Sequence, residues 1–190
     1  KTKRVLTMRI LATIIIVSML CLAPKMTLAV DGFFLNVGQG MGNYLIQNKS
    51  SSGANQFAAG AFWQTGQTYN HSFLGYSELE IEAYYAQISH HDELNILAVR
   101  PVLNFWGSAE NKRAWYWQFG VGLSYVDGKK LDDITTSTHG QFITFLGAGM
   151  PLDKQQKHRL TLRYNHYSNG YIETPNPGID TISLDWHYRF

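Results

Sequence analysis

Three side chains near the end of the sequence have the types needed for nucleophilic catalysis. They are His166, Ser168 and Asp180. A serine nucleophile needs a base that removes its hydroxyl proton and an acceptor that fixes the tautomer of the base. A histidine and a carboxylate supply these two functions, and their order along the chain is immaterial because such triads are defined by geometry. Their use in one site depends on whether the flanking segments bring them together.

The flanking segments have the alternating pattern of β-strands. In residues 181–190 the even positions are apolar and the odd positions polar, and residues 160–164 alternate in the same way. Successive side chains of a strand point to opposite faces, so the pattern places His166, Ser168 and Asp180 on the apolar face of one predicted hairpin. Polar groups on a face that meets lipid cost free energy, and this cost suggests that they have a use.

The predicted hairpin brings these groups within reach of one another. Same-face neighbours on a strand lie about 7 Å apart and opposed residues of paired strands about 5 Å apart. Asn169, through its side-chain amide, and Gly170, through its backbone N–H, are candidate donors to an oxyanion. Glu173 is a second carboxylate beyond the serine, but no strand fixes its direction in the loop. We therefore expect Asp180 to orient His166.

The motif H-Y-S-N at 166–169, followed by P-N-P-G at 175–178 and an acidic residue, resembles the PagL family of lipid A 3-O-deacylases. The resemblance implies a small outer-membrane β-barrel esterase with a Ser-His-Glu triad. It implies hydrolysis of the ester-linked acyl chain at the 3-position of lipid A, with lipopolysaccharide and outer-membrane lipids as partners. The clear match covers about the last thirty residues. The sequence departs from the family at Asp180, where the family has Glu.

The first 29 residues are typical of a secretory signal peptide. Basic residues precede an apolar run at 10–22, and a T-x-A cleavage site ends at Ala29. The apolar run is too short for a transmembrane helix. We expect residues 1–29 to be removed and residues 30–190 to form one outer-membrane barrel domain.

Composition excludes several classes of protein. The chain has 190 residues with 16 basic and 14 acidic side chains, and the signal segment holds five of the basic residues and none of the acidic ones. The remainder is mildly acidic and has no basic cluster, which argues against a nucleic-acid partner. We expect no cofactor. His90 and His91 precede Asp92, but we expect no metal site because adjacent residues at a strand end point apart.

Strand-like segments recur along the whole exported part. Before the hairpin they are found at about 31–48, 57–68, 79–88, 94–106, 115–125 and 142–150. With the hairpin this predicts an all-β fold, an eight-stranded antiparallel transmembrane β-barrel, in which closure satisfies every backbone group in lipid. Glu80 and Glu82 should face the lumen, where Arg100 or Arg163 could pair with them. The loops at 126–140 and 169–179 should be external, which puts the predicted site at the outer leaflet.

Two other functions remain open from the sequence. A small barrel of this kind could be non-enzymatic and serve structure or adhesion. It could also be a lipid A acyltransferase, which would need an internal acyl pocket, and four inward glycines could clear one: Gly120, Gly122, Gly147 and Gly149. The sequence is also compatible with a homo-oligomer.

Overall fold

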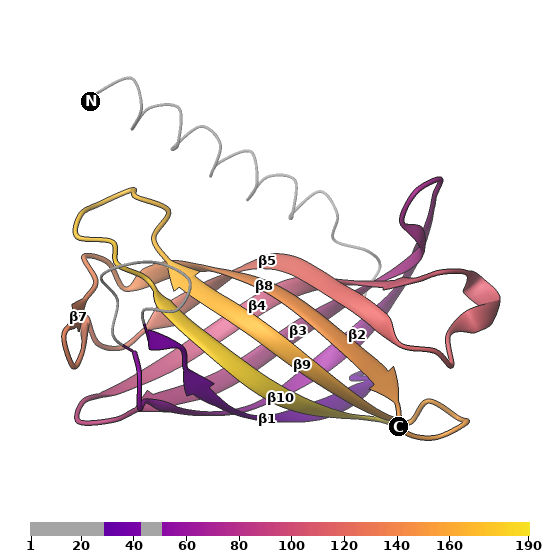
Figure 1. Ribbon diagram of the computed structural model, residues 1–190, viewed down its shortest axis with the longest axis horizontal. Helices are drawn as coiled ribbons and strands as arrows, with labels where there is room; N and C mark the ends of the chain where they lie inside the picture. The colour runs from indigo at the N-terminus through magenta and orange to yellow at the C-terminus, as the bar shows by residue number, and fades with distance from the viewer. Residues whose placement is uncertain (1–28, 43–50) are drawn as a thin grey trace.

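Eight long antiparallel strands close into a barrel in the computed structural model, which describes residues 29–42 and 51–190 (Figure 1). In sequence order they are β1 (Gly32–Gly40), β2 (Asn55–His71), β3 (Gly75–Ser89), β4 (Glu93–Trp106), β5 (Tyr116–Val126), β8 (Gly140–Pro151), β9 (His158–Ser168) and β10 (Ile179–Arg189). β1 pairs with β10 and closes the sheet. This confirms the predicted fold.

The strand limits differ from the sequence pattern at several points. β1 ends at Gly40, whereas the pattern extends to residue 48, and residues 43–48 lie outside the described range, as does the predicted signal segment up to residue 28. β3 begins four residues before the predicted strand. A short 3₁₀ helix, η2 (Ala109–Asn111), lies between β4 and β5. In the described ranges no helix is long and apolar enough to cross a membrane.

The predicted external loop at 126–140 contains a small hairpin that the sequence analysis missed. It consists of β6 (Lys130–Leu131) and β7 (Ile134–Thr135). Strands of two residues are too short to show a period-two pattern. Leu131 and Ile134 are fully buried and join the apolar core formed by the lumen-facing residues of the neighbouring strands. The hairpin thus closes one end of the barrel with apolar side chains.

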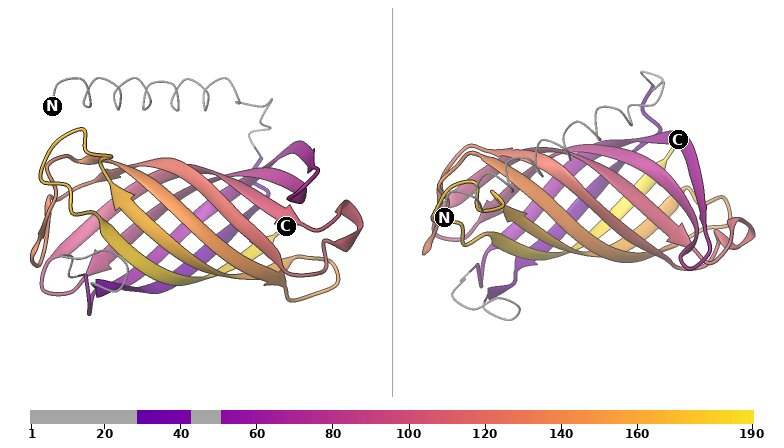
Figure 2. Two further views of the ribbon diagram at one scale, coloured as in Figure 1. Left: turned by 45° about the horizontal axis from the view of Figure 1, so that its top comes forward. Right: turned by 90° about the horizontal axis from the view of Figure 1, so that it is seen from above.

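The loops define two different ends of the molecule. One end, here called the loop end, carries the connections after β1, β3, β5 and β9, and the other, the turn end, carries the C-terminus and the connections after β2, β4 and β8. The strands run obliquely between them, with β7 and the loop after β9 at one end and the C-terminus at the other (Figures 1 and 2).

The outward face of the barrel is apolar around its circumference. Large apolar side chains are exposed on all eight long strands, among them Val37, Phe57, Tyr85, Leu97, Trp117, Leu146, Leu162 and Leu184. An exposed apolar surface of this extent requires a nonpolar surrounding, and alternation of apolar outward and polar inward residues is the pattern of outer-membrane barrels. The face predicted to meet lipid is therefore the exposed one.

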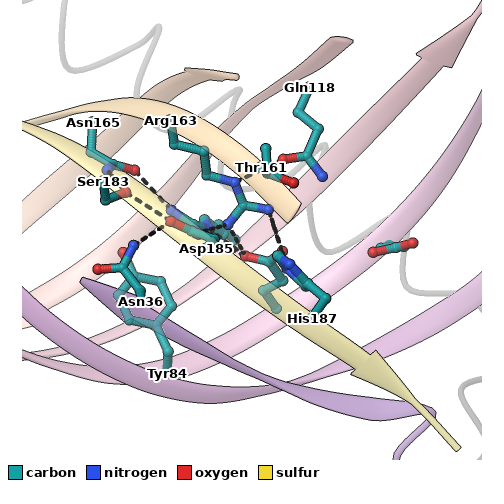
Figure 3. A network of polar contacts seen from close by, with 12 residues as sticks. Asn36, Tyr84, Gln118, Thr161, Arg163, Asn165, Ser183, Asp185 and His187 are labelled. Carbon is teal, nitrogen blue, oxygen red and sulfur yellow. Dashed lines mark hydrogen bonds and ion pairs between the residues drawn. The ribbon is translucent and has the colours of Figure 1, made fainter. Parts of the chain in front are cut away.

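A network of buried charges fills the middle of the lumen (Figure 3). Glu82 pairs with Arg100 and Arg163 at 2.7 Å each, and Arg163 also contacts Asp185 at 2.8 Å. His187 lies 3.1 Å from Glu82. These groups are almost fully buried, so each one depends on its partners for the interactions that water would otherwise supply. The predicted lumen position of Glu82 is confirmed, and Glu82 pairs with both of the arginines that were considered as alternatives.

Glu80 makes a second ion pair, nearer the turn end. Its carboxylate accepts two hydrogen bonds from the guanidinium of Arg159, at 2.7 and 2.9 Å. The alternation pattern predicts Arg100 or Arg163 as the partner of Glu80. The strand pairing of the closed barrel instead places Arg159 across the lumen from Glu80. The alternation of β9 also predicts that Arg159 points inward.

The inward glycines do not clear an acyl pocket. A methyl group added at Gly120 would lie 2.6 Å from the Phe145 ring, and one at Gly122 would lie 2.4 Å from Cβ of Arg100. Gly147 and Gly149 lie similarly close to the side chains of β9 and β5. The glycines make room for large side chains in a narrow lumen, so this support for an acyltransferase is lost.

Pro101 affects only one of its two strand pairings. β3 and β4 pair without interruption across Ile81 and Pro101. The β4–β5 ladder has no pairs between Val99–Leu123 and Leu103–Phe119, although its register is the same on both sides. A proline lacks the N–H that a ladder requires, and the interrupted pairing of β4 lies on its β5 side.

The lumen network predicts a large loss of stability when Glu82 is neutralised. Glu82→Gln leaves two buried guanidinium groups with Asp185 as their remaining carboxylate partner in the described lumen, and breaking a buried pair costs about 3–5 kcal/mol. We expect a lower urea midpoint for the detergent-folded protein, measured by the gel mobility of unboiled samples. Glu110→Gln, an exposed change in η2, is the control. An unchanged midpoint for Glu82→Gln would show that the network contributes nothing to stability.

Candidate active site

His166 and Asp180 face each other across the β9–β10 ladder. They are direct register partners, and Nδ1 of His166 lies 2.6 Å from Oδ1 of Asp180. An ionised carboxylate only accepts hydrogen bonds, so Nδ1–H donates and Nε2 is left as the proton acceptor. This is the tautomer that a general base for a serine requires.

Tyr164 is a functional candidate that the sequence analysis missed. Its hydroxyl donates to the same Oδ1 of Asp180 at 2.8 Å. It precedes His166 by two residues on β9 and shares its outward face. Tyr164 faces Ile182, the next same-face residue after Asp180 on β10, so it is the diagonal neighbour of the carboxylate. Alternation alone places Tyr164 among the lipid-facing residues. Alternation combined with the β9–β10 register would have identified Tyr164 as a neighbour of Asp180.

Ser168 ends β9 on the same outward face, two residues after His166. It pairs with Phe142 of β8 and is half-buried. The spacing of a strand puts the two residues about 7 Å apart along the face. Among the described residues the Ser168 hydroxyl has no hydrogen bond. Triad contacts are often long in unliganded enzymes and tighten when substrate binds.

Asp180 is buried although its position in β10 points outward. It is 2% exposed, and the side chain of His166 is 24% exposed. The connection after β1 passes beside it, because Met41 N–H and the Ser51 hydroxyl both donate to the Asp180 carbonyl, at 2.8 and 3.0 Å. The carboxylate is thus sheltered while the imidazole remains accessible from outside the barrel.

Asn169 organises the loop after β9. Its side-chain NH₂ donates to the Ser137 hydroxyl at 2.7 Å and to the Glu173 carbonyl at 2.9 Å, and its backbone N–H donates to the Asn176 side chain at 3.0 Å. These bonds tie the loop to the connection after β5. Both side-chain donors of Asn169 are therefore engaged, and use of this amide for an oxyanion would require one of these bonds to be exchanged.

Gly170 offers a free backbone donor beside the serine. Its φ of +63° is a backbone conformation that residues other than glycine rarely adopt. Within the described ranges its N–H has no acceptor. Glu173 lies on the exposed part of the loop, and in the described structure its carboxylate makes no contact with His166. The carboxylate beside the imidazole is that of Asp180.

The prediction that the adjacent side chains of His90 and His91 point apart is wrong. Their ring centroids lie 3.9 Å apart, and both approach Asp132 of the β6–β7 turn instead of Asp92. The two residues lie in the turn after β3, where the alternation of a strand no longer applies. This cluster is also at the loop end, but on other strands than the catalytic candidates.

Fold and site together define a class: a small closed β-barrel of the outer-membrane type, with a histidine–carboxylate pair and a serine on the outward face near its loop end. A model of the PagL family, described as lipid A 3-O-deacylase (PagL), matches residues 55–189. The chain belongs to this family.

Two individual proteins illustrate the relationship. The lipid A deacylase PagL of Bordetella bronchiseptica (strain ATCC BAA-588 / NCTC 13252 / RB50) is 30% identical over 90 residues, which are 47% of this chain and 47% of that protein. The match thus spans about half the length of this curated relative. The crystal structure of the outer membrane enzyme PagL superposes with a TM-score of 0.66 at 19% identity, covering 84% of this chain and 99% of that one. The structural likeness supports the fold.

The His166–Asp180 contact predicts how reactive Ser168 should be. We expect Ser168 to be labelled by a fluorophosphonate probe, and Asp180→Asn to slow labelling by up to about 10⁴-fold because the imidazole loses its orienting acceptor. Asp180→Glu should keep substantial reactivity, since it restores the family's residue. Labelling rates are measured on detergent-folded protein.

Glu173→Gln is the matched control, because it removes a carboxylate from the same loop region. Its labelling rate should stay within a fewfold of the parent. Loss of labelling in Glu173→Gln together with normal labelling in Asp180→Asn would contradict the assignment of the carboxylate.

Proposed function

We propose that this protein is a lipid A 3-O-deacylase, a serine esterase that removes the ester-linked acyl chain from the 3-position of lipid A in lipopolysaccharide. The single observation that carries the proposal is the 2.6 Å contact between His166 and Asp180 on the outward face, two residues from Ser168. Membership of the PagL family supports the substrate and the bond that is cleaved.

The proposed reaction proceeds in two steps. Nε2 of His166 takes the proton of Ser168 while Oγ attacks the ester carbonyl, and the same imidazole then protonates the departing 3-hydroxyl of the sugar. This leaves the fatty acid esterified to Ser168. A water molecule deprotonated by His166 attacks the acyl-enzyme, and Ser168 regains its proton as the free fatty acid leaves. Asp180 stabilises the imidazolium in both steps without taking its proton.

The tetrahedral intermediate of each step needs hydrogen-bond donors. We assign the role of first donor to the backbone N–H of Gly170. This group lies two residues beyond the nucleophile and makes no hydrogen bond within the described ranges. One such donor contributes about 3 kcal/mol in known hydrolases. Asn169 remains a predicted second donor. Its present contacts give it the role of holding the loop that carries Gly170.

The position of the site supports a lipid substrate. His166 and Ser168 lie on the apolar outward face, where a soluble substrate would have to displace lipid. The site is near the loop end, and the long loops of outer-membrane barrels face outside. A substrate in the outer leaflet reaches it by lateral movement within the membrane, and lipid A is the lipid anchor of that leaflet. A purely structural barrel gives no reason for a buried carboxylate paired with an imidazole on this face.

Ser168→Ala should abolish release of the 3-linked acyl chain while the barrel stays folded. The test incubates detergent-folded protein with purified lipopolysaccharide and follows the mass of lipid A, which should fall by one hydroxyacyl chain with the parent only. His166→Ala should be similarly inactive, and the two losses should not add, because triad members act as a unit. With phospholipid added as an acyl donor, a gain in lipid A mass would indicate acyl transfer, and no change with the parent would leave a structural barrel.

Tyr164→Phe should reduce turnover by about tenfold or more, because a hydrogen bond to a charged group contributes about 1.5–3 kcal/mol. The loss of the hydroxyl frees the carboxylate to leave its position against His166. The effect should disappear in the Asp180→Ala background, since both changes act through one contact. Tyr188→Phe, on the same outward face of β10, is the control and should be unchanged. A Tyr164→Phe effect of equal size with and without Asp180 would contradict this role.

A further inference from the structure

A second cluster of functional side chains lies at the loop end. Two turns form it: residues 90–92 connect β3 to β4, and Asp132 and Asp133 connect β6 to β7. His90, His91 and Asp132 each present one donor atom, and the three atoms lie within 4.8 Å of one another. They border a surface hollow of about 400 Å³ that also includes Ser52, Asp92, Lys130 and Asp133.

Asp132 is held rigidly at the centre of this cluster. Its carboxylate accepts backbone N–H bonds from His91 and Asp92 at 3.1 and 3.3 Å, and its own N–H donates to Asp92 at 3.0 Å. Desolvation raises the pKa of Asp132, but hydrogen bonds from His90 and from these backbone groups hold it below its usual value. These bonds fix the position of the carboxylate, on a hairpin that is itself anchored in the core through Leu131 and Ile134.

A hydrogen bond to Asp132 explains the position of the His90 ring, but among the described residues no hydrogen bond explains the position of the His91 ring. Nδ1 of His90 lies 2.7 Å from Oδ2 of Asp132, a normal hydrogen bond. Nδ1 of His91 lies 3.5 Å from Oδ1, which is too long for one, and the side chain is 81% exposed. An exposed imidazole is free to turn to solvent, yet this one lies over the second oxygen of the same carboxylate, with its ring 3.9 Å from that of His90.

We propose that His90, His91 and Asp132 bind a zinc-class divalent cation. Two imidazoles and one carboxylate form a donor set that suits Zn²⁺, and nitrogen ligands select it over Mg²⁺ and Ca²⁺, which prefer oxygen. Zinc binds histidine nitrogen and carboxylate oxygen at about 2.0–2.2 Å, so ligand atoms of a tetrahedral site lie about 3.3 Å from one another. Nδ1 of His90 and Oδ2 of Asp132, now 2.7 Å apart, would separate slightly to admit the cation between them. Water completes the coordination from the open hollow.

Such a cation would link two external turns that share no strand pairing. Residues 90–92 and the β6–β7 hairpin are now joined by Asp132 and by Lys130, which contacts Asp92 at 3.0 Å. Gly53 brings the connection after β1 against the same place, since a methyl group there would lie 3.1 Å from Nε2 of His90. Metal binding to the folded state alone would stabilise this end of the barrel. This role is independent of the proposed ester hydrolysis.

The test is zinc titration by calorimetry of folded protein purified without a histidine tag. We expect one zinc per chain, with MgCl₂ giving no binding. His91→Ala and Asp132→Asn should each weaken zinc binding by at least about tenfold, because loss of a direct ligand costs no less than the 10–100-fold seen for outer-shell partners. Replacement by Co²⁺ should give the visible absorption of a low-coordinate site, and both variants should lose it.

Two further variants test whether zinc binds at this cluster or at another histidine of the chain. His158→Asn removes an imidazole at the turn end and should leave zinc binding unchanged. His166→Asn removes the imidazole beside Asp180 and should also leave it unchanged. The unboiled gel mobility of each variant verifies folding. Absence of zinc binding by the parent, binding that survives both His91→Ala and Asp132→Asn, or binding lost only in His166→Asn would each overturn the proposal.

Discussion

Closure of the sheet is the constraint on which the rest of this structure depends. Lipid offers no hydrogen bonds to a backbone, so each strand must be paired on both sides, and β1 must pair with β10. Once the ladder is closed, the direction of every strand side chain follows from its parity. The barrel therefore has two chemically distinct surfaces, and each strand residue belongs to one of them.

Polar groups on the inner and outer surfaces of the barrel are stabilised in different ways. Inside, the charges of Glu82, Arg100, Arg163 and Asp185 neutralise one another in a lumen too narrow to leave them in water. Outside, the polar groups near the loop end are satisfied locally, with Asp180 sheltered beneath Tyr164, His166 and the connection after β1. Tyr164, His166 and Ser168 are each partly exposed, so they remain accessible from outside the barrel. A histidine–carboxylate pair that faces lipid can thus exist without a buried, unpaired charge.

The loops at the loop end are held together by side chains and not by strand pairing. Asn169 bonds to Ser137, the β6–β7 hairpin inserts Leu131 and Ile134 into the core, and Asp132 caps the turn after β3. These contacts give the loop after β9 a fixed shape next to the serine. They also explain why the lumen is closed at this end, so that the proposed lipid substrate would approach from the membrane side and not through the barrel.

Local alternation was enough to predict the class of fold, the outward position of His166 and Ser168, and Asp180 as the carboxylate beside the imidazole. The alternation of apolar and polar residues depends only on neighbours in the sequence, so it can be recognised without knowing which strands pair. The partners themselves depend on register and closure: Arg159 opposite Glu80, Tyr164 on the carboxylate, and the side chains that fill the space beside the inward glycines. Turns such as 90–92 carry no periodicity at all, and the approach of His90 and His91 to Asp132 was decided by tertiary structure alone, because residues 42 positions apart meet there only after the barrel has closed.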